Sequence, residues 1–330
     1  MRKNQNKKVF LITGGAGFIG SHLAEVLLKQ DHRVLVIDNL STGSIDNISH
    51  LFKNSNFHFA RASITDKIVL DRLSSLSDII IHLAAVVGVE LIVKNTIHTI
   101  ETNIIGTQEV LRSAHRYRCR VLIASSSEVY GKGNIMPFNE DDDVILGSTS
   151  KSRWAYAESK MIDESLSLAY KREHGLDVVL FRLFNTVGPR QTGQYGMVIP
   201  RFIQQAIKND PITVFGDGTQ MRCFCDVRDV VRAIIGLANN QKASGQLFNI
   251  GSQEEISIME LAERVKKRTG SKSQIQKISY SDAYADGFED MLRRIPDIER
   301  IKSSIGWEPK YTLDEILDAI IAYEKSKIGR

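Results

Sequence analysis

Continuous apolar runs alternate along the first half of the chain with segments whose apolar residues recur at helical spacing. The apolar runs, which we predict to be buried strands, lie at 8–13, 33–38, 57–60, 78–85, 120–126 and 177–185. The amphipathic segments, which we predict to be helices, lie at 21–30, 96–118 and 153–174, the last before Gly175, a suitable C-cap. This alternation is typical of a parallel sheet covered by helices on both faces. We therefore predict an α/β fold with a doubly wound parallel sheet.

The pattern becomes more broken after residue 185. We predict helices at 197–209, 226–240, 255–270 and 312–326, with a strand and turn at 211–220 and a further strand at 246–252. This arrangement indicates two domains. The first covers 1–184 and takes back segments near 226–250, whereas 185–330 mainly form a smaller C-terminal α/β domain.

Composition narrows the class of protein. The 330 residues are 42% hydrophobic and 25% charged, as in globular domains, and no apolar run approaches a membrane span. The start of the chain has no signal-peptide core, so we expect a cytoplasmic protein without a membrane partner. A net charge of +4 without long basic runs gives no indication of nucleic-acid binding, although it suits a small anionic ligand.

Three cysteines, Cys119, Cys223 and Cys225, are too few for a closed disulfide set. Cys223 and Cys225 would share one face of a strand, but no second pair or histidine cluster accompanies them. We therefore interpret all three as packing residues and expect no metal.

A glycine-rich turn, TGGAGFIG at 13–20, joins the first strand to the first helix. Gly14 would permit the tight turn, Gly17 would let the backbone approach a pyrophosphate, and Gly20 would let the helix pack on the strand. The helix N-terminus would offer N–H groups to the phosphate. A glycine-rich turn without a ligand is the alternative, but the strand, the spacing and the helix together favour dinucleotide binding.

Asp38 ends the second strand, where a carboxylate can bind the hydroxyls of an adenosine ribose. It would repel a 2′-phosphate, and no Arg or Lys follows in NLSTGSIDN, so NAD is favoured over NADP. Asp38 could instead cap a turn.

Tyr156 and Lys160 stand four residues apart in WAYAESK. On a helix they share a face, so the ring could pack inward while the amine faces water. Alternatively, the ammonium lowers the pKa of the phenol so that Tyr156 can take a proton near neutral pH. The spacing alone does not choose between these interpretations.

The wider set of motifs carries a family resemblance. The turn has the spacing GxxGxxG, and HLAA at 82–85, TNIIGT at 102–107, SSSEVYG at 125–131 and YAESK at 156–160 follow in order. With these the chain resembles, over almost its whole length, the extended short-chain dehydrogenases/reductases, including the NAD-dependent sugar-nucleotide epimerases, dehydratases and decarboxylases. The resemblance implies a Rossmann domain that carries NAD, a C-terminal domain that carries a UDP-sugar, and a homodimer formed through the helices at 96–118 and 153–174.

The resemblance also implies roles for individual residues. Tyr156 would take a proton from a sugar hydroxyl, Lys160 would favour the phenolate and hold the nicotinamide ribose, and Ser126 would orient the sugar O4. Ser63 stands where the family often has an aspartate near the adenine. The implied cofactor contacts are Gly14, Gly17, Phe18, Ile19, Gly20, Asp38, Asn39, Ser41, Thr42, Gly43, Ser63, Ile64, Leu83, Ala84, Ala85, Asn103, Ser125, Tyr156 and Lys160.

Glu128 and Arg294 favour a decarboxylase within the family. The 4,6-dehydratases have an Asp–Glu pair where this chain has Ser127–Glu128, and Ser–Glu is similar to the UDP-glucuronate decarboxylases. Arg294 begins RIPDI, which resembles the RxPDI of these decarboxylases, and RWAYAESK resembles their RWxYxxxK. We expect burial to raise the pKa of Glu128 and make it an acid, and Arg294 to bind a carboxylate or the diphosphate. A structural role for Glu128, and solvated surface charges at Arg293 and Arg294, are the alternatives.

Other substrate contacts follow from the same resemblance. Asn185 and Arg222 look like residues that bind the diphosphate, and Arg190 could help or could only pair with an acid on a neighbouring loop. The loop AAVVGVELIVKN at 84–95 departs from the family, because the decarboxylases have a proline-rich loop there.

The sequence therefore predicts an NAD-dependent decarboxylase of a UDP-hexuronic acid that acts through a 4-keto intermediate. A 4-epimerase of a UDP-sugar or UDP-uronic acid is the alternative. A non-catalytic NAD-sensing module is less favoured, because the chain keeps Ser126, Tyr156 and Lys160.

Overall fold

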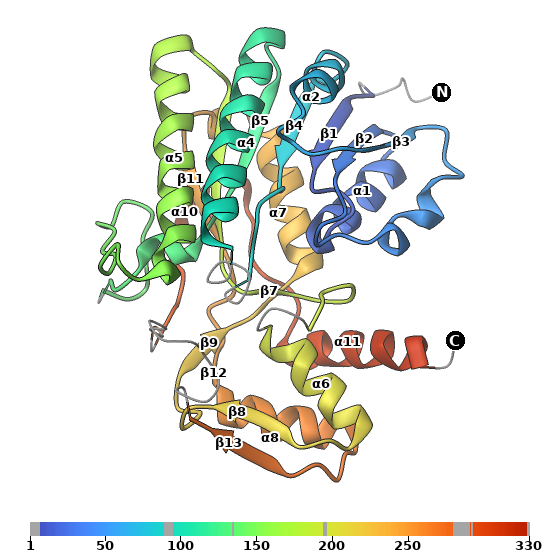
Figure 1. Cartoon of the computed structure of the whole chain (residues 1–330), viewed down its shortest axis with the longest axis vertical. Coiled ribbons are helices and arrows are strands. Elements are labelled where there is room, and N and C mark those ends of the chain that lie inside the picture. Colours follow the sequence, from blue (N-terminus) through green and yellow to red (C-terminus); the bar gives the residue numbers. More distant parts are fainter. Residues whose placement is uncertain are drawn as a thin grey trace.

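The computed structural model describes residues 7–88, 95–133, 135–193, 197–279, 291 and 293–328. In the view of Figure 1, a layered α/β body lies above a smaller group of helices and short strands, and α11 lies beneath the upper body.

A seven-stranded sheet forms the centre of the upper body, in the order β11-β6-β5-β4-β1-β2-β3. All neighbouring strands pair in parallel, which confirms the predicted α/β fold with a parallel sheet. The strands are β1 (Val9–Thr13), β2 (Arg33–Asp38), β3 (Phe57–Arg61), β4 (Ile79–His82), β5 (Arg120–Ser126), β6 (Val178–Leu183) and β11 (Leu247–Ile250).

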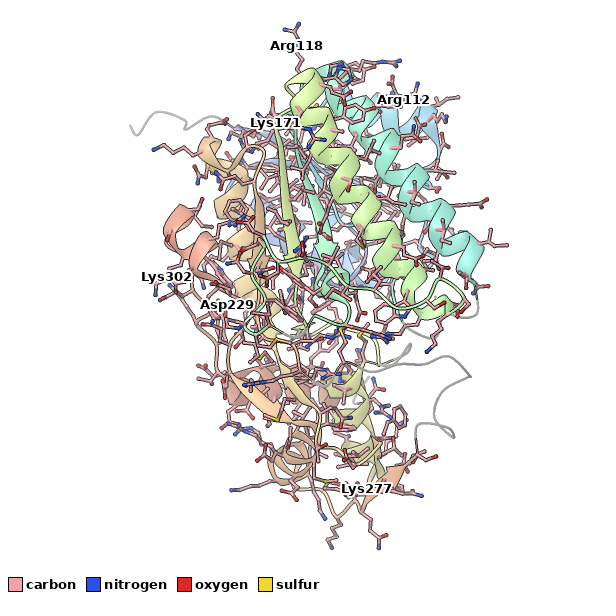
Figure 2. The ribbon with its side chains drawn as sticks, turned by 90° about the vertical axis from the view of Figure 1, so that its left-hand side faces the viewer. Arg112, Arg118, Lys171, Asp229, Lys277 and Lys302 are labelled. Atoms are coloured by element: carbon pink, nitrogen blue, oxygen red, sulfur yellow. The ribbon has the colours of Figure 1, made fainter. Side chains whose placement is uncertain are left out.

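Helices cover both faces of this sheet because the strands are apolar on both sides. One buried cluster joins the sheet to α1 (Phe18–Lys29) and α7 (Val227–Asn239). The cluster on the other face involves α2 (Lys67–Ser74), α4 (Thr96–Tyr117) and α5 (Ala155–His174). Figure 2 shows α4 and α5 side by side, with Arg112 on α4 and Lys171 on α5.

The lower body has its own buried cluster, formed by α6 (Val198–Lys208), α8 (Ile258–Thr269) and α11 (Leu313–Ile328) around a parallel strand pair. That pair is β8 (Ile212–Phe215) and β13 (Ile275–Ile278). The remaining elements are β7 (Thr186–Val187), β9 (Met221–Cys223), β10 (Cys225–Asp226), β12 (Glu255–Ser257), α10 (Glu299–Ile305) and the 3-10 helices η1 (Ile45–Asn47), η2 (Ser49–Leu51), η3 (Ser127–Tyr130), η4 (Ser152–Trp154) and η6 (Gln241–Ala243).

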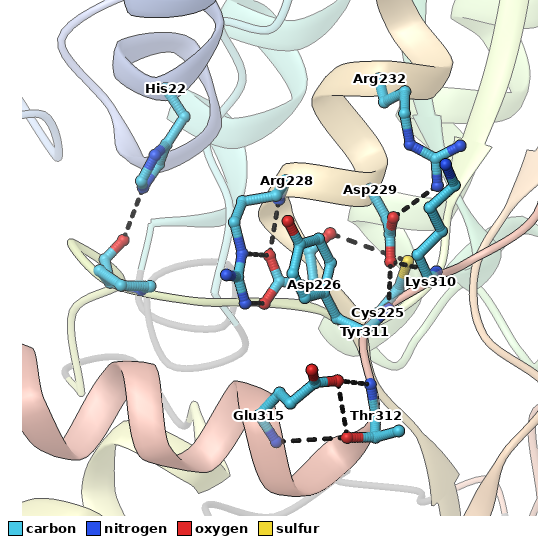
Figure 3. Close-up of polar contacts among 11 residues, drawn as sticks. His22, Cys225, Asp226, Arg228, Asp229, Arg232, Lys310, Tyr311, Thr312 and Glu315 are labelled. Atoms are coloured by element: carbon cyan, nitrogen blue, oxygen red, sulfur yellow. Dashed lines mark hydrogen bonds and ion pairs between the residues drawn. The ribbon is translucent and has the colours of Figure 1, made fainter.

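A buried aspartate at the start of α7 ties the two bodies together (Figure 3). Asp229 accepts hydrogen bonds from the backbone N–H groups of Lys310, at 2.8 Å, and Tyr311, at 3.1 Å. Its other oxygen pairs with Arg232, and its own carbonyl accepts from the indole of Trp307. The segment that enters α11 is therefore fixed to a helix of the upper sheet.

Most predicted elements are present, but several differ. The first helix begins at Phe18 rather than at residue 21, so it includes the last glycine of the turn. Residues 255–257 form β12, and Ser257 caps α8 with a capping box to Glu260, so the predicted helix begins too early. Helices α2 and α10 and strands β7 and β13 were not predicted.

The chain returns to the central sheet late in the sequence, because β11 pairs with β6 at its edge. The division into domains at 184/185 stays a prediction. Among the described residues, no helix combines the length and apolar character needed to cross a membrane. All three cysteines are buried and form no disulfide, as expected of packing residues.

Candidate active site

Two adjoining cavities lie at the carboxyl ends of the central strands. We call the larger, of about 1000 Å³, the glycine-turn cavity, because Gly14, Gly17 and Gly20 line it. The smaller, of about 400 Å³, is the arginine cavity, lined by Arg153, Arg201, Arg222 and Arg294. Ser126 and Tyr156 line both cavities. A ligand group in either cavity can therefore meet the same two hydroxyls.

The glycine turn has the backbone geometry that close approach of a ligand requires. Gly14 has φ of +71°, a conformation that other residues rarely adopt. A Cβ on Gly20 would lie 2.4 Å from the carbonyl oxygen of Gly14, and one on Gly17 would lie 3.1 Å from it. Gly17 is the N-cap of α1 and provides no side-chain cap, so N–H groups of the first turn are left for a ligand. The turn fits a pyrophosphate.

Asp38 ends β2 and lines the glycine-turn cavity, as predicted. Its carboxylate also accepts hydrogen bonds from the N–H groups of Ala16, at 3.0 Å, and Leu40, at 2.8 Å, so it stabilises the surrounding turns as well. Burial raises the pKa of this carboxyl, and these backbone bonds partly offset the effect. Arg61, its neighbour on β3, is exposed and does not line the cavity. The site therefore fits a free ribose better than a ribose 2′-phosphate.

Most of the predicted cofactor contacts line the glycine-turn cavity. Two do not: Asn103 is buried, donating to the Ser159 hydroxyl and accepting from the N–H of Val86, and Gly43 packs against Ala16. The predicted residues that line it are Gly14, Gly17, Phe18, Ile19, Gly20, Asp38, Asn39, Ser41, Thr42, Ser63, Ile64, Leu83, Ala84, Ala85, Ser125, Tyr156 and Lys160.

Tyr156 and Lys160 lie in the first turns of α5. The helix is anchored here by Trp154, which is buried against Gly147, where a Cβ would lie 2.1 Å from the indole nitrogen. Burial raises the pKa of Tyr156, while the charge of Lys160 and a hydrogen bond with Ser126 act to lower it. Lys160 therefore acts on the phenol in the predicted direction, but the net shift in the protein without ligand is upward.

A second acid lies next to this lysine. Lys160 Nζ is 2.9 Å from Asp163 Oδ2, and both side chains are buried. Burial opposes the charge of Lys160, but Asp163 and Tyr156 outweigh that effect, so the pKa of Lys160 is raised. Asp163 was not among the predicted site residues.

Glu128 faces the arginine cavity from η3 and pairs with two arginines. Arg294 Nη1 lies 2.5 Å from its Oε1, and Arg153 Nη2 lies 3.3 Å from its Oε2. Burial would raise the pKa of Glu128, but the charges of Arg294 and Arg153 outweigh it and lower the pKa. The expectation of a raised pKa and an acid at Glu128 is therefore wrong, because two cations distant in sequence surround the carboxylate.

The remaining predicted substrate residues lie in different places. Asn185 and Arg222 line the arginine cavity, where the Asn185 amide donates to the Cys223 carbonyl and Arg222 donates to that of Met221. Arg190 lines the glycine-turn cavity instead, and its guanidinium binds Glu25 and Ser21 of α1. This contact is of the kind left open for Arg190, pairing with an acid.

Arg293 and Arg294 differ sharply although they are adjacent. Arg293 is exposed and pairs with Glu255, whereas Arg294 is buried at Glu128. Residues 280–290 and 292, which precede the RIPDI motif, and residues 89–94 of the loop at 84–95 lie outside the described residues. Among the described lining residues, Glu128 is the one carboxylate in the arginine cavity.

Arg153 is the main residue of the arginine cavity that sequence reasoning missed. It stands three residues before Tyr156 and two before the first residue of α5, and its guanidinium lies 5.1 Å from the Trp154 ring centre. The RW pair in RWAYAESK was the available signal, but a sequence does not show that this arginine turns toward Glu128.

Comparisons with known proteins agree with this geometry. The family model described as GDP-mannose 4,6 dehydratase matches residues 11–320. A UDP-N-acetyl-alpha-D-glucosaminuronate decarboxylase of Bacillus cytotoxicus is 42% identical, covering 96% of this chain and 98% of that protein. UDP-glucuronic acid decarboxylase 1 of Danio rerio is 36% identical over 97% of this chain and 73% of its own length.

A solved structure provides a further comparison. UDP-glucuronic acid 4-epimerase from Bacillus cereus, in complex with UDP-glucuronic acid and NAD, superposes with a TM-score of 0.87. It is 30% identical, and the match covers 97% of this chain and 99% of that one.

Proposed function

Because this chain belongs to the GDP-mannose 4,6-dehydratase family, within the extended short-chain dehydrogenases/reductases, we propose that it is an NAD-dependent decarboxylase of a UDP-hexuronic acid. The observation that carries the proposal is Glu128 held by Arg153 and Arg294 beside Tyr156. Arginine pairs suit carboxylates and diphosphates through their planar donor geometry. Relatives named as uronate decarboxylases at 36–42% identity support the same reaction.

NAD fits the glycine-turn cavity, where the turn at Gly14–Gly20 would hold the pyrophosphate and Asp38 the adenosine ribose. When bound, NAD supplies acceptance and return of a hydride at C4 of the sugar. The pyrophosphate of the UDP-sugar would lie with Arg222 and Asn185 in the arginine cavity. Tyr156, which lines both cavities, is then placed between cofactor and sugar.

The residues of this chain would act on the sugar as follows. Tyr156 removes the proton from the C4 hydroxyl, Lys160 stabilises the phenolate, and Ser126 hydrogen-bonds the phenol. A ketone at C4 is β to the carboxylate on C5, so the C5–carboxylate bond can break, releasing CO₂ and leaving an enolate that is protonated at C5. Return of the hydride to C4 gives a UDP-pentose.

Glu128 would contribute as an anion, since its pKa is lowered. A substrate carboxylate that reaches Arg153 and Arg294 must share these cations with Glu128. The repulsion between the carboxylates of Glu128 and the substrate is relieved when CO₂ leaves. Loss of CO₂ is therefore favoured over direct return of the hydride to C4.

A 4-epimerase is the second candidate, favoured by the structural similarity to a UDP-glucuronic acid 4-epimerase. It would use the same Tyr156, Lys160 and carboxylate contacts, and it would return the hydride to the opposite face of C4 without loss of CO₂.

We test the proposal by proton NMR of the protein with NAD and, separately, UDP-glucuronate, UDP-N-acetylglucosaminuronate, UDP-glucose and UDP-N-acetylglucosamine. A UDP-pentose or UDP-4-keto-pentose with CO₂ release is expected from a uronate. A product changed only at C4, without CO₂, would establish the epimerase instead. Tyr156→Phe is the negative control for either reaction.

A homodimer that packs through α4 and α5 is proposed as well. Ile97, Ile105 and Ile162 expose apolar side chains on these helices, at 75%, 42% and 46%. A cytoplasmic location stays a prediction. Light scattering of Ile97→Lys and Ile162→Lys would test the dimer, because charges there should yield monomers.

A further inference from the structure

A buried ion pair lies on the protein side of the proposed catalytic lysine. Lys160 lines the glycine-turn cavity with Tyr156, whereas Asp163, one helical turn further along α5, lines neither cavity and has no exposed surface. The two groups are 2.9 Å apart. Asp163 is thus closed off from ligands, and its direct contact with the proposed catalytic groups is the ion pair with Lys160.

The other titratable groups around Lys160 leave Asp163 as its main counter-ion. Tyr156 and Glu164 face it from α5, and His82 faces it from β4. Glu164 is itself bound by Arg182 of β6 through bonds of 2.9 and 2.7 Å. Burial, with a smaller effect of Lys160, lowers the pKa of His82 to about 3, so this imidazole is neutral.

A row of buried side chains behind Asp163 holds its carboxylate in place. His82 Nδ1 is 2.7 Å from the hydroxyl of Thr13 at the end of β1, and its Nε2 is 3.1 Å from that of Thr107 on α4. Burial raises the pKa of Asp163, whereas the charge and hydrogen bond of Lys160, with a smaller effect of the Thr107 hydroxyl, act to lower it. With the proton on Nε2, Thr13 donates to His82 and His82 donates to Thr107. Lys160 is therefore the partner that most favours the ionised form of Asp163.

A buried lysine without a counter-ion loses its proton, because burial lowers a lysine pKa by as much as about 3–5 units. A neutral Lys160 would no longer stabilise a phenolate at Tyr156. We propose that Asp163 is a positioning residue whose negative charge keeps Lys160 protonated and directed at Tyr156. The inference rests on the proposed function for the role of Tyr156, but the ion pair itself can be tested without any substrate.

The first test compares the stability of Asp163→Asn with that of Glu158→Gln, which removes one negative charge from the same helix. In the Glu158→Gln protein the folded-state pKa of Lys160 is raised, so the stabilisation from the pair is present below the unfolded-state pKa, about 10.4. In Asp163→Asn the main counter-ion is lost, so we expect burial to outweigh the remaining effects of Tyr156 and Glu164 and to lower the folded-state pKa of Lys160. Stability is then lost below about 10.4 and regained as the pH rises toward that value.

The gap in the free energy of unfolding between the two variants should therefore be largest near neutral pH and shrink as the pH approaches about 10. A gap that does not change with pH would show that Asp163 is only a hydrogen-bonding residue, and it would overturn the proposal. If Asp163→Asn does not fold, the folding of the double variant Lys160→Met/Asp163→Asn, which removes both charges of the pair, is measured instead. Recovery of folding supports charge pairing, and failure of the double variant contradicts it.

The second test is the pH profile of kcat/KM on the substrate identified by NMR. In Asp163→Asn the alkaline limb should move down by at least about one pH unit, because Lys160 deprotonates earlier, and Asp163→Glu should restore much of the profile. A uniform drop without a shift, or a shift of the acidic limb alone, would contradict the proposal. If no uronate is turned over, the proposed function fails, while the unfolding comparison still decides the role of Asp163.

Discussion

Two acids lie close to Tyr156, each paired with cations, but they differ in access to ligands. Glu128 pairs with Arg153 and Arg294 and is 24% exposed in its side chain, facing the arginine cavity. Asp163 pairs with Lys160 and is fully buried. The arginines that hold Glu128 can be shared with a substrate carboxylate, whereas Asp163 can only set the charge of Lys160. Similar ion pairs can thus serve substrate binding or internal electrostatics according to solvent access alone.

The largest effect is expected from removing the hydroxyl of Tyr156, which lies close to both Glu128 and Asp163. Tyr156→Phe should lower kcat by at least about a hundredfold, because it removes the proposed acceptor of the C4 proton. Single-turnover formation of the 4-keto sugar measures this. Tyr170→Phe, on the same helix, is the matched control and should retain activity. Comparable losses in both variants would mean that the phenol at 156 has no special role.

The next largest effect is expected at Glu128, the acid that faces the arginine cavity. Glu128→Gln keeps the shape but removes the charge, and kcat for the uronate should fall about a hundredfold while KM does not rise, because the arginines become more available to substrate. Steady-state kinetics on the uronate measure both parameters. A rise in KM with unchanged kcat would assign Glu128 a binding role instead.

Because the pKa of Glu128 is lowered, the stability difference between wild type and Glu128→Gln should depend on pH. The folded-state pKa lies below the unfolded value of about 4.3, so the stabilisation is present above that value and lost as the pH falls through the folded-state pKa. The stability difference between wild type and Glu128→Gln, followed by chemical denaturation, should therefore shrink in acid. A difference that stays constant would indicate that the two arginines do not hold the carboxylate ionised.

Arg153, which holds Glu128, should also set the preference for a uronate over a neutral sugar. Arg153→Lys keeps a positive charge but loses the planar donor pair, so kcat/KM for the uronate should fall about tenfold or more. Binding of UDP-glucose, which has no carboxylate, should change little. Steady-state kinetics on the uronate and calorimetric titration of UDP-glucose measure the contrast. A loss of UDP-glucose binding as large as the loss in kcat/KM for the uronate would assign Arg153 to the diphosphate or to folding.

The smallest effect on activity is expected at Thr107, which lies behind the buried Asp163. Thr107→Val removes the hydroxyl between His82 and Asp163 and should cost about 1–3 kcal/mol of stability, because a buried imidazole N–H loses its acceptor. Activity should stay within about threefold of wild type, since Asp163 still pairs with Lys160. Thermal unfolding and kinetics give the two values. Thr99→Val, a buried threonine of the same helix that donates to the Asn95 carbonyl, is the control.

Local patterns in the sequence were enough to predict the elements that carry the site. The strand at 120–126, the helix that ends before Gly175 and the placement of Asp38 at the end of a strand depend on apolar runs and caps, which neighbouring residues determine. The boundaries of α1 and α8 were less accurate, since Phe18 and Ser257 are set by tertiary packing and by a capping box.

The charges of the site could not be predicted in the same way. Glu128 meets Arg153 at a sequence separation of 25 and Arg294 at 166, so the sign of its pKa shift depends on the folded arrangement. Asp163 lies only three residues from Lys160, and its spacing was available, but its burial against α4 and β4 was not. Motifs therefore indicated candidate reacting groups, whereas the direction of their pKa shifts required the structure.

The late arrival of β11 at the edge of the sheet has a consequence for folding during synthesis. Until residues 247–250 leave the ribosome, β6 has one row of unpaired N–H and C=O groups, the kind of edge that pairs with other chains. Residues 184–246 emerge during that interval, and they include the lower-body helix α6. The nascent chain is therefore most exposed to misassembly while this part is being made, and a chaperone that covers β6 would be needed only until β11 docks.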